Sequence, residues 1–81
     1  MRVTVCFYSY FKDLTGCARF TEELAAGSTL ENLFQALVVR FPKLGAMQKA
    51  TLMAVGVDYQ PRTYVLREGE EVSLFPPVQG G

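Results

Sequence analysis

The feature that most constrains the fold is one amphipathic helix set between strand-like segments. Its apolar side chains recur with helical spacing and form a single stripe made of Leu30, Leu33, Phe34, Leu37, Val38 and Phe41. Ser28 and Glu31 have the spacing of a capping box at its start. Pro42 ends it, because the residue before a proline is disfavoured in the α region.

The segments before this helix alternate as β-strands do. Residues 2–8 place Val3, Val5 and Phe7 on one face and Arg2, Thr4, Cys6 and Tyr8 on the other. Residues 18–24 form a weaker strand, in which Arg19, Thr21 and Glu23 face water and Phe20, Glu22 and Leu24 face the opposite way. A short connection, "FKDLTG", joins the two strands through a helical turn or loop that closes at Gly16, which predicts an antiparallel hairpin.

The segments after the helix complete a sheet. Residues 43–51 form a short second helix with Leu44, Met47 and Leu52 inward, and residues 52–57 form a buried strand. Residues 58–66 are a turn that leads into a poor edge strand, because Pro61 is disfavoured at a central position. Residues 71–75 form the last strand, beside the first, with Val72 and Leu74 on one face and Ser73 and Phe75 on the other. This order predicts an α+β fold in which one main helix packs on one face of a mixed sheet.

Composition excludes several classes of function. The 81 residues form one domain, and eight basic residues balance eight acidic ones, so neither nucleic acid nor a membrane is an expected partner. Histidine is absent, and Cys6 and Cys17 lack metal-ligand spacing, so we expect no intrinsic cofactor or metal; the sequence alone leaves a disulfide open. A hydrophobic fraction of 49% favours a protein partner. With neither a secretory h-region nor a membrane-spanning run, we expect a soluble cytoplasmic protein.

Side-chain catalysis finds little support in the sequence. The adjacent pairs Glu22–Glu23 and Glu70–Glu71 face opposite sides of a strand and are predicted to be solvated carboxylates, and Thr15 and the serines have no base nearby. Lys43 and Lys49 are predicted to be solvated too.

The remaining reactive group is the main-chain carboxylate of Gly81. Gly80 and Gly81 lack a Cβ, so their backbone is able to enter a narrow site. Pro76 and Pro77 end the sheet ladder, and residues 77–81 reach about 17 Å beyond the fold. The apolar Phe75, Pro76 and Val78 suit a docking surface at the base of this tail. The simplest alternative is a frayed terminus without a role.

The C-terminal segment "EGEEVSLFPPVQGG", residues 68–81, closely resembles the signature of the MoaD/ThiS sulfur carriers, in particular the small subunits of molybdopterin synthase. The resemblance implies a ubiquitin-like β-grasp domain of four to five strands over residues 1–76 and an extended tail over residues 77–81. One departure is Gly56, where many relatives carry Asn.

The resemblance also implies a mechanism with a non-catalytic role for this chain. An E1-like adenylyltransferase, using ATP and Mg²⁺, would convert the Gly81 carboxylate to an acyl-adenylate, and a sulfur donor would turn it into a thiocarboxylate. The large subunit would carry the catalytic residues that move this sulfur to a cyclic pyranopterin precursor, in a heterotetramer of two small and two large subunits. The implied partner-binding residues are Phe7, Phe75, Pro76, Pro77, Val78, Gln79 and Gly80.

Three alternatives stay open at this point. Sulfur carriers for thiamine or cysteine synthesis share the chemistry but more often lack the double proline. A ubiquitin-like modifier would couple Gly81 to a lysine of a target protein. A plain interaction domain would carry an inert tail.

Overall fold

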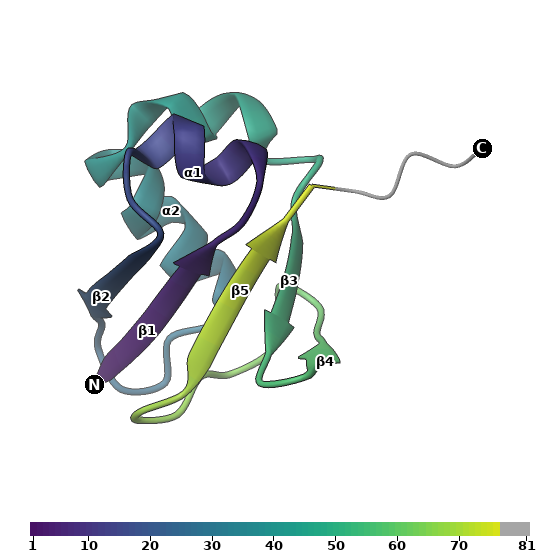
Figure 1. Cartoon of the computed structure of the whole chain (residues 1–81). Coiled ribbons are helices and arrows are strands. Elements are labelled where there is room, and N and C mark those ends of the chain that lie inside the picture. Colours follow the sequence, from purple (N-terminus) through teal and green to yellow (C-terminus); the bar gives the residue numbers. More distant parts are fainter. Residues whose placement is uncertain (77–81) are drawn as a thin grey trace.

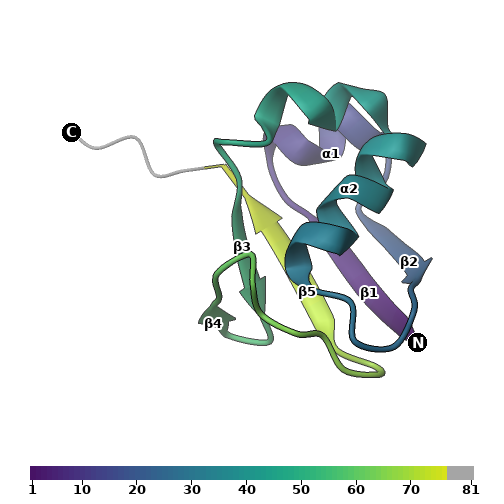
Figure 2. The same ribbon diagram turned by 180° about the vertical axis from the view of Figure 1, so that it is seen from behind.

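A computed structural model describes residues 1–76, so the predicted tail over residues 77–81 lies outside the described part. The elements in chain order are β1 (Arg2–Phe7), α1 (Tyr10–Thr15), β2 (Arg19–Glu23), α2 (Leu30–Arg40), the 3₁₀ helix η1 (Pro42–Met47), β3 (Leu52–Val55), β4 (Asp58–Tyr59) and β5 (Glu71–Phe75). The strands form one sheet in the order β2-β1-β5-β3-β4. The α2 helix lies behind this sheet in Figure 1 and in front of it in Figure 2, so it covers one face.

The sheet is mixed because β1 and β5 pair in parallel, with Val5 opposite Val72, whereas the other pairs are antiparallel. The last strand therefore lies beside the first, as predicted, and occupies the centre of the sheet. The predicted α+β class, with a mixed sheet and one main helix on one face, is confirmed. Within residues 1–76, no helix combines the length and the apolar character needed to cross a membrane.

The core lies between α2 and the covered face of the sheet. The alternation of β1 is confirmed, since Val3, Val5 and Phe7 are at most 1% exposed. They pack in one cluster with Leu30, Leu33, Phe34 and Leu37 of α2 and with Val72 and Leu74 of β5. Each such side chain contributes about 1.5–3 kcal/mol by leaving water.

Phe7 is part of this core, so its expected place on a partner-binding surface is wrong. Its side chain points to the covered face with Val3 and Val5, and its ring packs edge-on against Phe41 at a centroid distance of 5.7 Å. The period of two along β1 decides this, because Phe7 must share a face with Val5.

The capping box of α2 is one residue later than the Ser28–Glu31 pair that we predicted. The Thr29 hydroxyl accepts from the Asn32 N–H at 3.2 Å, and the Asn32 side-chain oxygen accepts from the Thr29 N–H at 2.9 Å. Ser28 is held in the loop before the helix, because its carbonyl accepts from the Leu66 N–H at 2.8 Å. At the other end, helix α2 stops before Phe41 and Pro42, as predicted.

The segments between α2 and β5 differ from prediction in detail. The short second helix is the 3₁₀ helix η1, and Leu44 within it is buried, but Leu52 belongs to β3 and is 37% exposed. The edge strand β4 precedes Pro61 instead of following it, and Val65 makes only an isolated bridge to Thr29.

Gly56 turns the chain between β3 and β4 with a φ of +62°. Asn is the side chain that best tolerates this left-handed region, so Gly and Asn are conformational equivalents at this position.

Candidate functional site

The glutamates of the two adjacent pairs, Glu22–Glu23 and Glu70–Glu71, each bind another side chain of the fold. Glu22 is only 3% exposed, so our prediction that it is solvated was wrong. It accepts two hydrogen bonds from Arg40, at 2.9 and 3.2 Å, and the Arg40 guanidinium also lies over the Phe20 ring. Glu23 points to the other face of the sheet and pairs with Arg2 at 3.0 Å. As predicted, this pair does not converge on one point.

Glu70 and Glu71 also serve the fold. Glu70 accepts from the Tyr64 hydroxyl and from the Arg67 N–H, both at 2.7 Å, and the first of these bonds raises the pKa of Tyr64. Glu71 pairs with Arg19 at 3.2 Å. Cys6 and Cys17 are free thiols, and no group of three or more His, Cys, Asp or Glu side chains suited to a metal occurs among residues 1–76.

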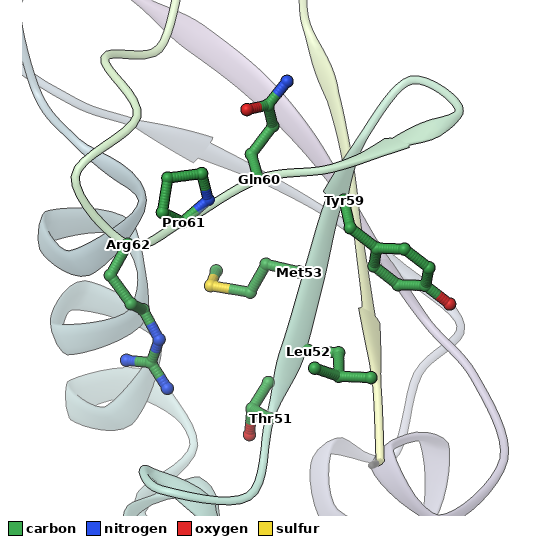
Figure 3. Close-up of a pocket in the computed structure, with 7 residues that line it drawn as sticks. All are labelled: Thr51, Leu52, Met53, Tyr59, Gln60, Pro61 and Arg62. Atoms are coloured by element: carbon green, nitrogen blue, oxygen red, sulfur yellow. The ribbon is translucent and has the colours of Figure 1, made fainter. Parts of the chain in front are cut away.

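A notch of about 390 Å³ opens where β4 turns away from β3 (Figure 3), lined by Thr51, Leu52, Met53, Tyr59, Gln60, Pro61 and Arg62. Arg62 is the charged residue in this lining, and the fold already uses its guanidinium. It donates to Glu31 at 2.9 Å and to the Gln48 carbonyl, and it lies 4.5 Å from the centroid of the Phe34 ring. The residues that line this pocket therefore do not form a set of catalytic side chains.

The most distinctive surface lies where the chain leaves the sheet at the end of β5. β5 ends at Phe75, between the end of β1 and the start of β3, and Leu74 points into the core with no exposed surface. Phe75 points to the opposite, uncovered face. Its ring stacks on Tyr8 at 5.1 Å and meets Tyr59 edge-on at 6.0 Å.

Leu52 lies opposite Phe75 in the β3–β5 register and completes an apolar surface that we call the exit patch: Tyr8, Leu52, Tyr59 and Phe75. Tyr8, Leu52 and Tyr59 are all exposed, and Phe75 and Pro76 are half-buried. Of the four residues of the exit patch, we predicted Phe75 from the sequence, along with the adjacent Pro76, and missed Tyr8, Leu52 and Tyr59. Strand alternation in the sequence already placed Tyr8 on the other face of the sheet from Phe7. The cross-strand register that brings Tyr8, Leu52 and Tyr59 together around Phe75 is a property of the tertiary structure.

The other candidates lie outside the described residues. Pro77, Val78, Gln79, Gly80 and Gly81 follow directly from the exit patch in the chain. Their roles in partner binding, and that of the Gly81 carboxylate, stay predictions. The structure contributes the surface from which they start.

Curated relatives extend over the whole chain. A molybdopterin synthase sulfur carrier subunit of Chlamydomonas reinhardtii is 28% identical over 83 residues, covering all of both chains. Another protein of that name, from Arabidopsis thaliana, is 25% identical over 81 residues, covering all of this chain and 84% of the relative.

Solved structures share the fold. A putative molybdopterin converting factor subunit 1 of Pyrococcus furiosus is 26% identical, with a TM-score of 0.87 over 96% of this chain and 99% of that one. The protein SAMP1 of Haloferax volcanii has a TM-score of 0.89 over all of both chains at 18% identity, which shows the fold alone. A chain in a complex of molybdopterin-converting factor subunits 1 and 2 from Helicobacter pylori has a TM-score of 0.70 at 23% identity, with both chains fully covered.

These neighbours confirm the ubiquitin-like β-grasp fold that the sequence resemblance implied. The family model of the ThiS family matches residues 5–81, a range that includes β5 and the two C-terminal glycines. The predicted relationship to the MoaD/ThiS sulfur carriers is thus confirmed, and the chain belongs to the ThiS family.

Proposed function

We propose that this protein is the sulfur-carrier subunit of a molybdopterin synthase. The observation that carries the proposal is a family match that reaches Gly81, together with full-length relatives that bear this name. The double proline at positions 76 and 77 favours this role over the thiamine and cysteine carriers. The carboxylates of Glu22, Glu23, Glu70 and Glu71 are committed to ion pairs and turns, which agrees with a role in which enzymes around this chain do the catalysis.

The reactive atoms in this proposal belong to the C-terminal carboxylate. An E1-like adenylyltransferase binds the domain, and a Gly81 carboxylate oxygen attacks the α-phosphorus of ATP while Mg²⁺-bound pyrophosphate leaves. Sulfur at the oxidation level of hydrosulfide, supplied by a donor, then attacks the acyl carbon, AMP leaves, and loss of the proton on sulfur leaves Gly81 as a thiocarboxylate. The large subunit receives this terminus and moves the sulfur to the cyclic pyranopterin precursor, where it becomes part of the dithiolene, and water restores the carboxylate. An anionic sulfur held inside a partner is shielded from water.

The exit patch is the proposed docking surface for the large subunit. It is apolar and aromatic, as interface anchors are, and the tail begins at its edge. A partner that covers Phe75 and Tyr8 would receive residues 77–81 directly into its active site. The Helicobacter pylori complex, which joins subunits 1 and 2 of the converting factor, supports a large-subunit partner. The proposed assembly has two small and two large subunits.

The second candidate is a protein modifier, favoured by the fold shared with SAMP1, which is described as small archaeal modifier protein 1. Intact-mass analysis of the chain from its native cells separates the two roles. A carrier shows oxygen replaced by sulfur at Gly81. A modifier shows Gly81 joined to lysine side chains in digests of other proteins, and finding this without the sulfur mass would overturn the carrier role.

Deletion of Gly81 tests the mechanism. The variant should lose sulfur loading and should no longer restore molybdopterin synthesis in cells that lack the native chain. Its thermal unfolding and its affinity for the large subunit should stay close to those of the parent chain, because residues 3–74 build the core and Tyr8, Leu52, Tyr59 and Phe75 build the exit patch. Restored synthesis by the deletion variant would contradict the mechanism.

A further inference from the structure

The outer edge of β2 is open for hydrogen bonding. The Phe7 N–H donates to the Ala18 carbonyl at 2.9 Å, and the Leu24 N–H donates to the Met1 carbonyl at 2.8 Å. In this antiparallel register the even-numbered residues of the strand bond to β1. The N–H and C=O groups of Arg19, Thr21 and Glu23 therefore point away from the sheet, and none of them has a hydrogen-bond partner among residues 1–76. β2 forms the free margin of the sheet in Figures 1 and 2.

Opposite charges flank Thr21 at equal spacing along this edge. Arg19 lies two residues before Thr21 and Glu23 lies two residues after it, and all three point to the uncovered face of the sheet. Within one molecule, Glu23 pairs with Arg2 at 3.0 Å and Arg19 pairs with Glu71 at 3.2 Å. All four side chains are at least half exposed, so each pair keeps room for a further charged neighbour.

We propose that two copies of this protein associate through their β2 edges, antiparallel about a twofold axis at Thr21. Thr21 then lies opposite Thr21 of the second copy, Arg19 lies opposite Glu23 of the second copy, and Glu23 lies opposite Arg19 of the second copy. These three residue pairs exchange about six main-chain hydrogen bonds. One continuous sheet then runs through both molecules.

The pairing joins the separate ion pairs into a row that crosses the interface. From one copy to the other, the row runs Arg2, Glu23, then Arg19 and Glu71 of the second copy, and the signs alternate throughout. Symmetry produces this row twice. Networks of several charges contribute more than isolated surface pairs do.

The same charges select this register. A slip by two residues in either direction places Thr21 opposite Arg19 or Glu23, so the charge pairs are lost. Parallel pairing in register brings Arg19 beside Arg19 and Glu23 beside Glu23, which is repulsive. Charged residues on an edge strand commonly prevent pairing. Here they oppose other registers and favour one.

The association leaves the proposed docking surface free and does not depend on the proposed function. The β1 strand separates β2 from β5, β3 and β4, which carry Phe75, Leu52 and Tyr59 of the exit patch, and Tyr8 follows β1, on the side of β2 away from the open edge. A dimer would therefore present two independent C-terminal tails.

Charge reversal tests the proposal on the full chain, by sedimentation equilibrium from micromolar to millimolar protein. Arg19→Glu and Glu23→Arg should each weaken self-association by at least about tenfold, because each puts like charges opposite one another. An equimolar mixture of the two variants should form heterodimers, detected by native mass spectrometry, because both charge pairs that cross the interface are complementary again. Within each variant chain, the ion pair of the replaced residue with Glu71 or Arg2 is lost. The double variant Arg19→Glu/Glu23→Arg should associate more tightly than either single variant, because the charges that cross the interface are complementary, and less tightly than the parent chain, because its pairs with Arg2 and Glu71 are lost.

Two further variants separate main-chain pairing from other contacts. Thr21→Pro removes an N–H that points away from β1, so the fold should persist by circular dichroism while self-association is lost. Phe75→Glu should leave self-association unchanged. A wild-type chain that stays monomeric at millimolar concentration, single variants that still associate, or a dimer that Phe75→Glu abolishes would each overturn the proposal.

Discussion

The ring of Tyr8 lies flat against the ring of Phe75, with centroids 5.1 Å apart and planes within 6° of parallel. The two residues follow Phe7 and Leu74, which are partners in the parallel pairing of β1 and β5. Because side chains alternate along a strand, core residues at one position place aromatic residues on the uncovered face at the next. The aromatic platform at the chain exit is thus a direct consequence of the parallel register.

Replacement of Phe75 by Glu tests the platform as a docking anchor. The charge should weaken binding to the large subunit by more than about 1 kcal/mol, roughly fivefold or more in affinity, because a desolvated aromatic contact is lost. Isothermal titration calorimetry measures this directly. Val57→Glu is the matched control, since Val57 is 96% exposed in the turn between β3 and β4 and should leave the affinity unchanged. Equal affinities for both variants would make Phe75 an ordinary surface residue.

The capping box of α2 predicts unequal effects of two neighbouring hydroxyls. Thr29→Ala should reduce the free energy of unfolding by about 1 kcal/mol, because the Asn32 N–H loses its acceptor at the helix start. Ser28→Ala removes only a hydroxyl bonded to the Ala25 carbonyl and should cost less. Urea denaturation of both variants gives the comparison. A larger effect at Ser28 would return the helix start to the position predicted from sequence.

The adjacent residues Glu22 and Glu23 should differ in their contribution to stability. Glu22→Ala should lower the free energy of unfolding by about 1–3 kcal/mol, because it removes a buried acceptor that holds Arg40 by two hydrogen bonds. Glu23→Ala removes an exposed ion pair and should cost less than about 1 kcal/mol. Chemical denaturation in low and high salt measures both. Similar losses for the two variants would contradict the burial of Glu22.

Glu31 introduces a pH dependence at the start of α2. A hydrogen bond from Gln35, followed by the contacts with Arg62, lowers the pKa of Glu31 below its ordinary value of 4.5. The unfolded chain therefore binds this proton more readily, so the stabilisation is present above about pH 4.5 and is lost as the pH falls through the folded pKa.

The variant Glu31→Gln should then be less stable than the parent chain at pH 7, and the difference should shrink below pH 4. Urea denaturation across this range is the measurement, with Glu23→Gln as a control for loss of a surface carboxylate. A stability difference that stays constant down to pH 3 would show that the carboxylate charge does not act through these partners.

Local patterns in the sequence predicted most of the elements. The stripe from Leu30 to Phe41 defined the main helix, and the alternation of β1 and β5 placed Val5 and Leu74 in the core. Pro42 and Gly16 marked the ends of the two α-helices, because their backbone preferences are intrinsic. The resemblance of residues 68–81 supplied the family and the candidate role of Gly81.

The tertiary structure decided the features in which residues distant in the sequence meet. The Leu66 N–H holds Ser28 in the loop and places the cap at Thr29, and a half-exposed Arg40 pairs with the buried carboxylate of Glu22. Register brings Tyr8, Leu52 and Tyr59 around Phe75, and strand order leaves the β2 edge open. Local preferences act within a few residues and are legible in sequence, whereas burial and cross-strand contacts depend on which segments pack together, and only the folded chain specifies that.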